Sequence, residues 1–290
     1  MATPEIQWYP GHIAKAEKAL LEQLKRVDVV LEVRDARIPQ ASCHPEISNW
    51  VGSKARVLVI NRVDQVTPQA VAAWRLWLQA RGKDPIFTDA QHGKGVAEVM
   101  RAAQQVGIQI NQRRRDRGMR PRPVRAVVIG FPNVGKSALI NRLLKRRIVD
   151  SARRPGVTRS LRWVRISDQL DLLDAPGVLP AKLLDQAAAY RLAICDDIGE
   201  ASYDTQLAAA ALVETLQKLP DYNAQVAGFG PPNPLNARYH LDAKDCSGET
   251  YVATLATARY QRDRERAARQ LLSDFRKGLL GSIALEMPSE

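Results

Sequence analysis

The chain has 290 residues with ordinary hydrophobic (45%) and charged (26%) fractions, so we expect one large and one small globular domain. Its net charge of +12 favours a polyanionic partner, with nucleic acid ahead of an incidental basic surface. No apolar run reaches the ~18 residues that cross a bilayer, which argues against a membrane span. The absence of a CxxC pair argues against a disulfide framework and a zinc site. No secretory signal is visible, so we expect the cytoplasm.

The first part of the chain alternates predicted helices and strands. Helices are expected over 13–25, 68–80 and 95–106. Short apolar strands are expected over Val27–Val33, Ala55–Ile60 and Pro85–Thr88. The helix at 68 has a clear start, because Thr67 is a good N-cap and Pro68 suits the first helical position. This alternation predicts a parallel sheet with helices packed on it.

Residues 113–125 interrupt the alternation. The stretch holds seven arginines together with Gly118, Pro121 and Pro123. We interpret it as a basic connector without a buried face. Two roles fit this composition equally well, an arm that contacts RNA and a solvated tether.

The alternation resumes after the connector and then ends. Strands are expected over Ala126–Ile129, Leu161–Ile166 and Leu170–Leu173, with a helix over 136–146. Helices are also expected over 183–219 and 249–280, with a glycine- and proline-rich loop over 221–236 between them. We therefore expect an α/β domain over 1–182 and a smaller all-helical domain over 183–290.

The segment from Gly130 to Ser137 fits the GxxxxGK[ST] pattern of a phosphate-binding loop. A predicted strand precedes it and a predicted helix follows, as the mechanism requires, because backbone N–H groups and the helix N-terminus then surround the phosphates. Lys136 would reach the β- and γ-phosphates, and Ser137 would ligate Mg²⁺. The nucleotide contacts expected here come from Asn133, Val134, Gly135, Lys136, Ser137 and Ala138.

Two further segments extend the phosphate site. Asp174-Ala175-Pro176-Gly177 has the DxxG pattern and follows a predicted strand, so that Asp174 could hold Mg²⁺ through water and the Gly177 N–H could meet a γ-phosphate. Thr158 lies in the intervening loop and is the candidate switch residue that binds Mg²⁺ only when the γ-phosphate is present. The alternative for Thr158 is an ordinary loop threonine.

The base-binding candidates lie earlier in the chain. Asn61-Arg62-Val63-Asp64 resembles the guanine-specifying NKxD pattern, with Arg62 in place of lysine. A carboxylate at Asp64 would accept the N1–H and N2–H of guanine and would face a lone pair on adenine. Asn61 would brace the phosphate loop, and the stem of Arg62 would cover the base. The next predicted strand ends at Thr88, where a backbone N–H, expected at Ala90, would meet the guanine O6.

The order of these motifs predicts a circular permutation. In an ordinary small GTPase the phosphate loop comes first and the base motifs come last, whereas here the base motifs precede the phosphate loop. One sheet can still form if the former chain ends are joined, and the basic connector over 113–125 sits where that join is needed. The new end leaves directly after DxxG, so we expect the helical domain to read the nucleotide state.

In these motifs and their order, the sequence resembles the YlqF/RbgA family of circularly permuted GTPases that act in assembly of the large ribosomal subunit. The resemblance also covers residues 6–16, the Asp35-Ala36-Arg37 segment within 28–39, and residues 274–281. It implies GTP and GDP as ligands, Mg²⁺ as a cofactor, the large subunit and its rRNA as partners, no DNA and no membrane. A monomer is the default expectation.

The resemblance also suggests how hydrolysis works. Many GTPases place a water-orienting glutamine after DxxG, but Val178 stands there. The family resemblance suggests His12 as the catalytic group, and the alternative is that His12 only caps the first helix. Asn133 resembles the asparagine of K⁺-dependent GTPases, which makes K⁺ a candidate ion. The alternative function is a GTP-gated signalling switch with a protein effector, and the intact Lys136 argues against a vestigial nucleotide site.

Overall fold

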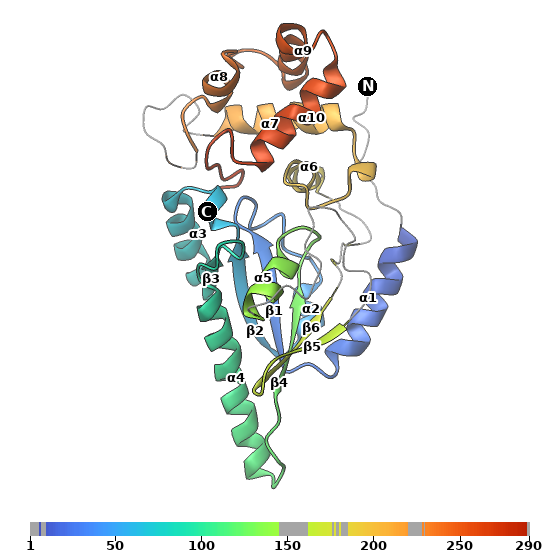
Figure 1. The fold of residues 1–290 in the computed structure, drawn as a ribbon, viewed down its shortest axis with the longest axis vertical. Helices are drawn as coiled ribbons and strands as arrows, with labels where there is room; N and C mark the ends of the chain where they lie inside the picture. The colour runs from blue at the N-terminus through green and yellow to red at the C-terminus, as the bar shows by residue number, and fades with distance from the viewer. Residues whose placement is uncertain are drawn as a thin grey trace.

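The structure, a computed structural model, describes residues 6, 10–144, 162–175, 177, 180, 185–219, 228 and 230–288. Its centre is a six-stranded sheet in the order β3-β2-β1-β4-β6-β5 (Figure 1). The strands are β1 (Val29–Asp35), β2 (Ala55–Asn61), β3 (Pro85–Thr88), β4 (Val124–Ile129), β5 (Arg162–Ser167) and β6 (Leu170–Asp174). All neighbours pair in parallel except β5, which pairs antiparallel with β6. The predicted α/β class with a mostly parallel sheet is confirmed.

The described helices first flank the sheet and then form a C-terminal helical region. They are α1 (Pro10–Leu24), α2 (Ile47–Val51), α3 (Pro68–Gln79), α4 (Val96–Asp116), α5 (Lys136–Leu143), α6 (Gln186–Ile194), α7 (Thr205–Lys218), α8 (Pro234–Tyr239), α9 (Gly248–Arg259) and α10 (Arg264–Arg276). Short 3₁₀ turns lie at Val63–Gln65 and Glu200–Ser202. Among the described residues, no helix combines the length and apolar character needed to span a bilayer.

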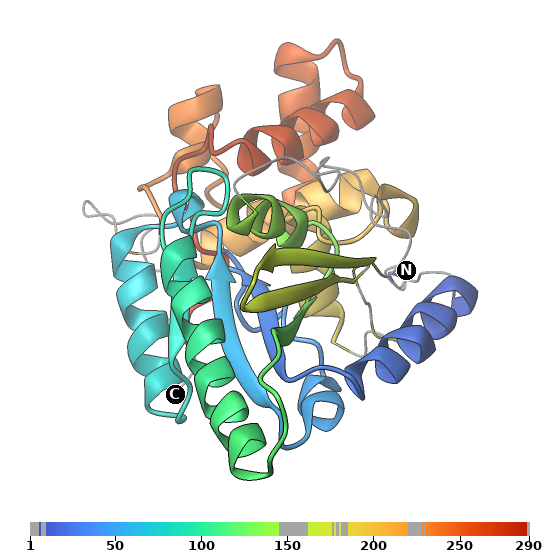
Figure 2. The ribbon, with the colours of Figure 1, turned by 60° about the horizontal axis from the view of Figure 1, so that its bottom comes forward.

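Alternating side chains of the strands bury both faces of the sheet. Val57 and Val59 of β2 belong to the cluster that includes α4 and α5, whereas Leu58 and Ile60 pack with α3. Figure 2 shows α4 in front of the strands. α1 and α2 cover the same side as α3, against β1 and β4. Every residue of β1 is buried, as expected for a central parallel strand. This packing fixes the carboxyl ends of the strands, where the loops that carry the motifs begin.

Several predicted boundaries differ from those of the structure, and the predicted helix over 249–280 is two helices, α9 and α10. β1 lies two residues later than predicted, and just before it the Asp28 carboxylate accepts from the side chain of Arg122 and the backbone N–H of Arg125. α4 does not end near 106 but continues to Asp116, so the first arginines of the predicted connector are helical. Arginine is a good helix former and is favourable in a last turn, and both effects support this extension.

The helical region contacts the α/β part through its last described residues. α7, α9 and α10 share one buried cluster, and they lie at one end of the molecule (Figure 1). The segment after α10 then returns to the sheet side. Its backbone donates from Ile283 to Gln65 and from Leu285 to Arg37, both at 2.9 Å. The Trp74 indole donates to the Glu286 carbonyl at 3.2 Å. These bonds hold the helical region against the loops that follow β1 and β2.

Candidate nucleotide-binding site

The phosphate loop connects β4 to α5, as predicted. Lys136 is the first residue of α5, and its Nζ donates to the carbonyls of Gly130 (3.1 Å) and Phe131 (2.7 Å). The side chain is buried, and burial lowers the pKa of Lys136 to about 8, against the opposing charges of Asp174 and Asp197. A phosphate that took this ammonium from the two carbonyls would gain a charge-assisted hydrogen bond.

Two glycines allow the close contacts around this loop. Gly135 has φ 98°, and a Cβ there would lie 2.1 Å from the Asn61 amide nitrogen. A Cβ on Gly177, the last residue of DxxG, would lie 2.6 Å from the backbone nitrogen of Pro132. Gly177 therefore packs directly on the phosphate loop, and its predicted place beside the γ-phosphate is compatible with this contact.

The register of the sheet places the DxxG aspartate, Asp174, beside the start of the phosphate loop. β6 lies beside β4, with Asp174 opposite Val128, two residues before the phosphate loop begins. Asp174 is buried, and its charge opposes the loss of the Lys136 proton. Ser137 lies in the first turn of α5, next to Lys136. Thr158 and Val178 lie outside the described residues, so the phosphate site is described through Lys136, Ser137, Asp174 and Gly177.

Asn61 joins the base motif to the phosphate loop. Its Nδ2 donates to the Val134 carbonyl at 2.9 Å. Its Oδ1 accepts from the Thr88 hydroxyl and the Ala90 N–H, each at 3.0 Å. One buried amide thus ties together three loops at the carboxyl edge of the sheet. The Ala90 N–H is engaged with Asn61 in this structure, so a contact with guanine O6 requires that bond to be shared or exchanged.

Arg62 is directed towards the phosphate loop. It adopts a left-handed backbone with φ 68°. Its guanidinium donates to the Asn133 carbonyl, and its Nε lies 3.5 Å from the Asp35 carboxylate. These contacts use the guanidinium and leave the aliphatic stem of Arg62 for the base, so its predicted place over the base is compatible with the structure.

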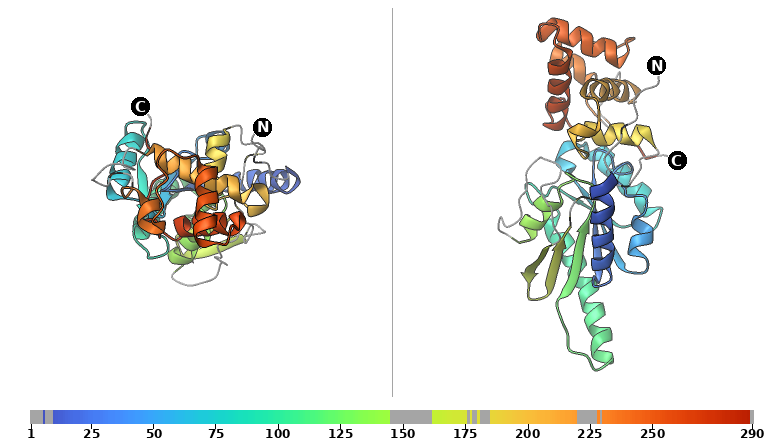
Figure 3. Two further views of the ribbon diagram at one scale, coloured as in Figure 1. Left: turned by 90° about the horizontal axis from the view of Figure 1, so that it is seen from above. Right: turned by 90° about the vertical axis from the view of Figure 1, so that its right-hand side faces the viewer.

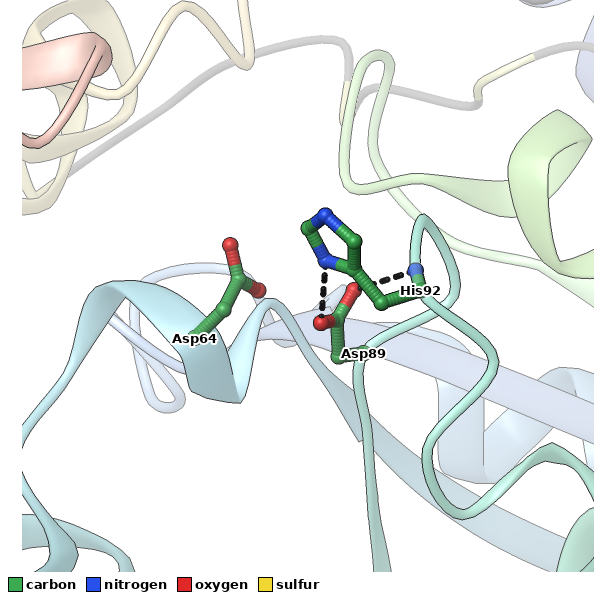
Figure 4. A group of neighbouring side chains, drawn as sticks. All are labelled: Asp64, Asp89 and His92. Atoms are coloured by element: carbon green, nitrogen blue, oxygen red, sulfur yellow. Dashed lines mark hydrogen bonds and ion pairs between the residues drawn. The ribbon is translucent and has the colours of Figure 1, made fainter.

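Asp64, the carboxylate predicted to specify the base, has two polar neighbours that the sequence did not predict. Asp64 lies in the 3₁₀ turn after β2, and Asp89 and His92 lie in the loop after β3 (Figure 4). The Asp89 carboxylate accepts from the His92 backbone at 3.0 Å and lies 2.6 Å from its Nδ1. Burial and then the charge of Asp89 raise the pKa of Asp64. Two N–H donors from guanine would reduce the repulsion between the carboxylates of Asp64 and Asp89.

Replacing Asp64 with asparagine tests the base pocket. The amide offers one acceptor and one donor where guanine needs two acceptors, so the preference for GTP over ATP should fall by about 100-fold and xanthine nucleotides should gain affinity. Equilibrium binding of GTP, XTP and ATP measures both effects. Asp64 is exposed, so the variant should fold normally. An unchanged preference would place the base elsewhere.

The turn after α6 contacts the phosphate loop. Asn133 Nδ2 donates to the Asp196 carbonyl at 2.6 Å, and Arg37 Nη2 donates to the Cys195 carbonyl at 2.9 Å. From the helical region, Arg276 of α10 donates to the carbonyls of Ala193 (2.9 Å) and Ile194 (3.0 Å). The end of α6 is therefore bonded on one side to the nucleotide loops and on the other to α10.

Asp197 is the unusual member of this turn. It is fully buried, and among the described residues neither of its carboxylate oxygens has a hydrogen-bond partner. Burial and then Asp35 raise the pKa of Asp197 well above its usual range, although Arg62 and Arg37 oppose the shift. Such a group is costly when charged, and no local sequence pattern marks it, because its surroundings are made by distant segments.

Comparison with known proteins gives one consistent result. Residues 125–219 match the model of the 50S ribosome-binding GTPase family. The chain is 33% identical to ribosome biogenesis GTPase A of Priestia megaterium, over 98% of both chains. It is 30% identical to mitochondrial ribosome-associated GTPase 1 of Mus musculus, over 97% of this chain and 90% of that protein.

The fold agrees with these relatives. The crystal structure of GNP-bound YlqF from T. maritima superposes with a TM-score of 0.66 at 20% identity, over 95% of this chain and 99% of that one. Together with the predicted motif order and the joined base and phosphate loops, these matches show that the chain belongs to the ribosome biogenesis GTPase A (YlqF/RbgA) family of GTPases.

Proposed function

We propose that the protein binds GTP, hydrolyses it to GDP and phosphate, and uses this cycle in maturation of the large ribosomal subunit. The observation that carries the proposal is the Asn61 side chain, which joins the base motif to the phosphate loop through Val134 and to the end of β3 through Thr88. The relatives are named as ribosome biogenesis or ribosome-associated GTPases, which supports the same partner. We expect a monomer in the cytoplasm, although the mouse relative is named mitochondrial.

The donors at the phosphate site suit Mg²⁺. Asp174 supplies a buried carboxylate beside the phosphate loop, and Ser137 supplies a hydroxyl on the first turn of α5. Hard oxygen donors of this kind, completed by phosphate oxygens and water, are what Mg²⁺ prefers. Thr158 is proposed as the additional ligand when the γ-phosphate is present. When bound, the ion would neutralise charge on the phosphates, while Lys136 and the loop N–H groups hold them in position.

K⁺ is proposed as a second ion near Asn133. The Nδ2 of this side chain is used by the Asp196 carbonyl, so its Oδ1 is the atom that suits a monovalent cation. A cation there would add positive charge beside the phosphates, the role that an arginine finger has in other GTPases. The nearby Asp196 carboxylate would favour the same cation.

His12 is proposed as the catalytic group that orients or deprotonates the attacking water. Its backbone lies in the first turn of α1, and its side chain lies outside the described part of the structure. His12→Ala should leave GTP affinity nearly intact and slow hydrolysis at least about tenfold. His12→Gln, which can orient water but cannot accept its proton, separates the two roles. Equal turnover in His12→Ala and the wild type would remove His12 from the mechanism.

The helical region is proposed to read the nucleotide state through the turn after α6. Asn133 of the phosphate loop and Arg276 of α10 hold neighbouring carbonyls of this turn, Asp196 and Ile194. A shift of the phosphate loop on GTP binding would therefore reach α10 through a single short segment. Arg259, Arg262, Arg264, Arg266 and Arg269 of the helical region, with Lys277, are proposed rRNA contacts.

Co-sedimentation with purified large ribosomal subunits tests the partner. Binding should depend on nucleotide, because the helical region is tied to the phosphate loop, and it should weaken steeply with salt, because phosphate contacts release counterions. Small subunits are the matched control. Binding of neither subunit with any nucleotide would favour the alternative function, a GTP-gated switch with a protein effector.

A further inference from the structure

We propose that the tip of α4 and the turn after it, residues 108–123, form a rigid arginine arm that binds the phosphate backbone of RNA in the large-subunit particle. The arm lies at the opposite end of the molecule from α9 and α10 (Figure 3). This inference rests on the proposed function, and it adds a second RNA-binding surface, within the α/β part. The structure thereby favours an RNA-contacting arm over a tether.

The arm is a projection without a core of its own. The last buried residue of α4 is Gly107, where a Cβ would lie 2.2 Å from a side-chain methyl of Val124. β4 begins at Val124, so residues 108–123 extend beyond the end of the sheet at which β4 begins. The helical part, to Asp116, projects by roughly 13 Å at 1.5 Å per residue. Because this part of the helix buries no apolar face, it does not contribute to the core, and we expect it to bind another molecule.

Hydrogen bonds hold the arm in one shape. α4 ends in a Schellman motif, in which Gly118 has a left-handed backbone with φ 71°. The Gly118 N–H donates to the Arg115 carbonyl at 2.8 Å, and the Met119 N–H donates to the Arg114 carbonyl at 2.9 Å. The Asn111 side chain then donates to and accepts from the Arg122 backbone, at 2.9 and 3.0 Å. These bonds exclude a loose tether, since the returning chain is fastened to the helix that it follows.

Arg122 fixes the base of the arm. Its guanidinium donates twice to the Asp28 carboxylate, at 2.7 and 2.8 Å, just before β1 begins. The bidentate pair is partly buried, so this arginine has a structural role. The arm is thus anchored to the central strands at one end and free of the protein at the other.

The remaining arginines of the arm carry charge that the protein does not neutralise. Arg113, Arg115, Arg117 and Arg120 are exposed, and within the described part of the chain none of them has an ion pair with a carboxylate. The one acidic residue of the tip, Asp116, is bonded by Gln112 at 2.9 Å. Arg115 donates to the Gln112 side chain at 2.9 Å, but none of the described carboxylates forms an ion pair with these four guanidiniums. On a preformed scaffold they match phosphate groups, which arginine binds in bidentate geometry.

The geometry favours contact with the backbone over reading of bases. The major groove of an RNA helix is deep and narrow, and side chains cannot read its bases. An α-helix is about 10–12 Å wide with its side chains. Binding by the arm should therefore depend on salt and little on sequence, as expected for phosphate contacts.

The test replaces Arg113, Arg115, Arg117 and Arg120 with glutamine, a residue of similar helix propensity. The matched control removes the same charge from four other exposed residues, Lys25, Arg26, Arg81 and Lys218. Affinity for purified large subunits and for protein-free large-subunit rRNA is measured from low to high salt. The arm variant should lose at least about tenfold in affinity, and its slope of log K against log salt should fall by about 3. GTP affinity should not change.

Each outcome decides the inference. Equal slopes for the arm variant and the control on protein-free rRNA would overturn it. A loss with intact subunits that is absent with protein-free rRNA would also overturn it and would indicate an acidic protein surface as the partner. If the wild type binds rRNA through the arm but binds no large subunit, the proposed function fails and the RNA-binding arm stands.

Discussion

Replacing Lys136 with methionine should lower kcat/KM for GTP by at least about 100-fold, because the proposed role of this ammonium is to bind the phosphate that is transferred. Methionine keeps the buried stem, so the loss measures the charge more than the packing. The control is Lys54→Met, which lies before β2, at the end of the sheet away from the site. A Lys136 variant with the turnover of the control would contradict the placement of the phosphate site.

The same lysine predicts a pH dependence of nucleotide binding. Burial lowers the pKa of Lys136 to about 8, and a bound phosphate favours the charged ammonium and so raises that pKa. GTP affinity should therefore be level below about pH 8 and fall by up to tenfold per pH unit above it, until the pKa of the complex is reached. Calorimetric titration between pH 7 and 9.5 measures the trend. Lys136→Met should lack it.

Replacing Arg37 with methionine should reduce the free energy of unfolding by about 3–5 kcal/mol, because it leaves a buried carboxylate without its main partner. Arg37 and Asp35 are both buried, and the guanidinium donates to the carboxylate at 3.0 and 2.7 Å. Burial alone would raise the pKa of Asp35, but Arg37 and then Arg62 hold it below its usual range. The other cation, Arg62, is farther away, at 3.5 Å.

Urea unfolding of the nucleotide-free protein checks this cost. Arg34→Met is the matched control, because its buried partner Glu32 keeps a second ion pair with Arg56. Adding Asp35→Asn to Arg37→Met removes the orphaned charge and should recover part of the loss. If Arg37→Met costs no more than Arg34→Met, the Asp35–Arg37 pair does not have the stabilising role assigned to it.

The sequence predicted what local patterns determine. Lys136 begins α5 and Asn61 ends β2, as predicted, because a strand end, a glycine and a polar residue occur together in short motifs. The start of α3 was predicted from its N-cap, and Thr67 does accept from the Ala70 N–H at 3.2 Å. The end of α4 was missed because its last turns have no periodic apolar residues. The helix continues through arginines that do not pack in the core.

Tertiary contacts explain the rest of what was missed. Asp197 is fully buried, and the charges of Asp35, Arg37 and Arg62 act on it from distant parts of the sequence, so no window of sequence marks its environment. The return of Leu285 to Arg37 also joins segments at opposite ends of the chain. Likewise, the neighbours of Asp64 could not be predicted from NRxD, because Asp89 and His92 come from the loop after another strand.

The most direct test of the central claim is GTP hydrolysis in a buffer with Mg²⁺ and K⁺, measured with and without purified large ribosomal subunits, with ATP as the control nucleotide. We expect slow hydrolysis by the protein alone, stimulation by large subunits of at least about tenfold, and no reaction with ATP. A GTPase rate that large subunits leave unchanged, or ATP hydrolysis at a similar rate, would contradict the central claim.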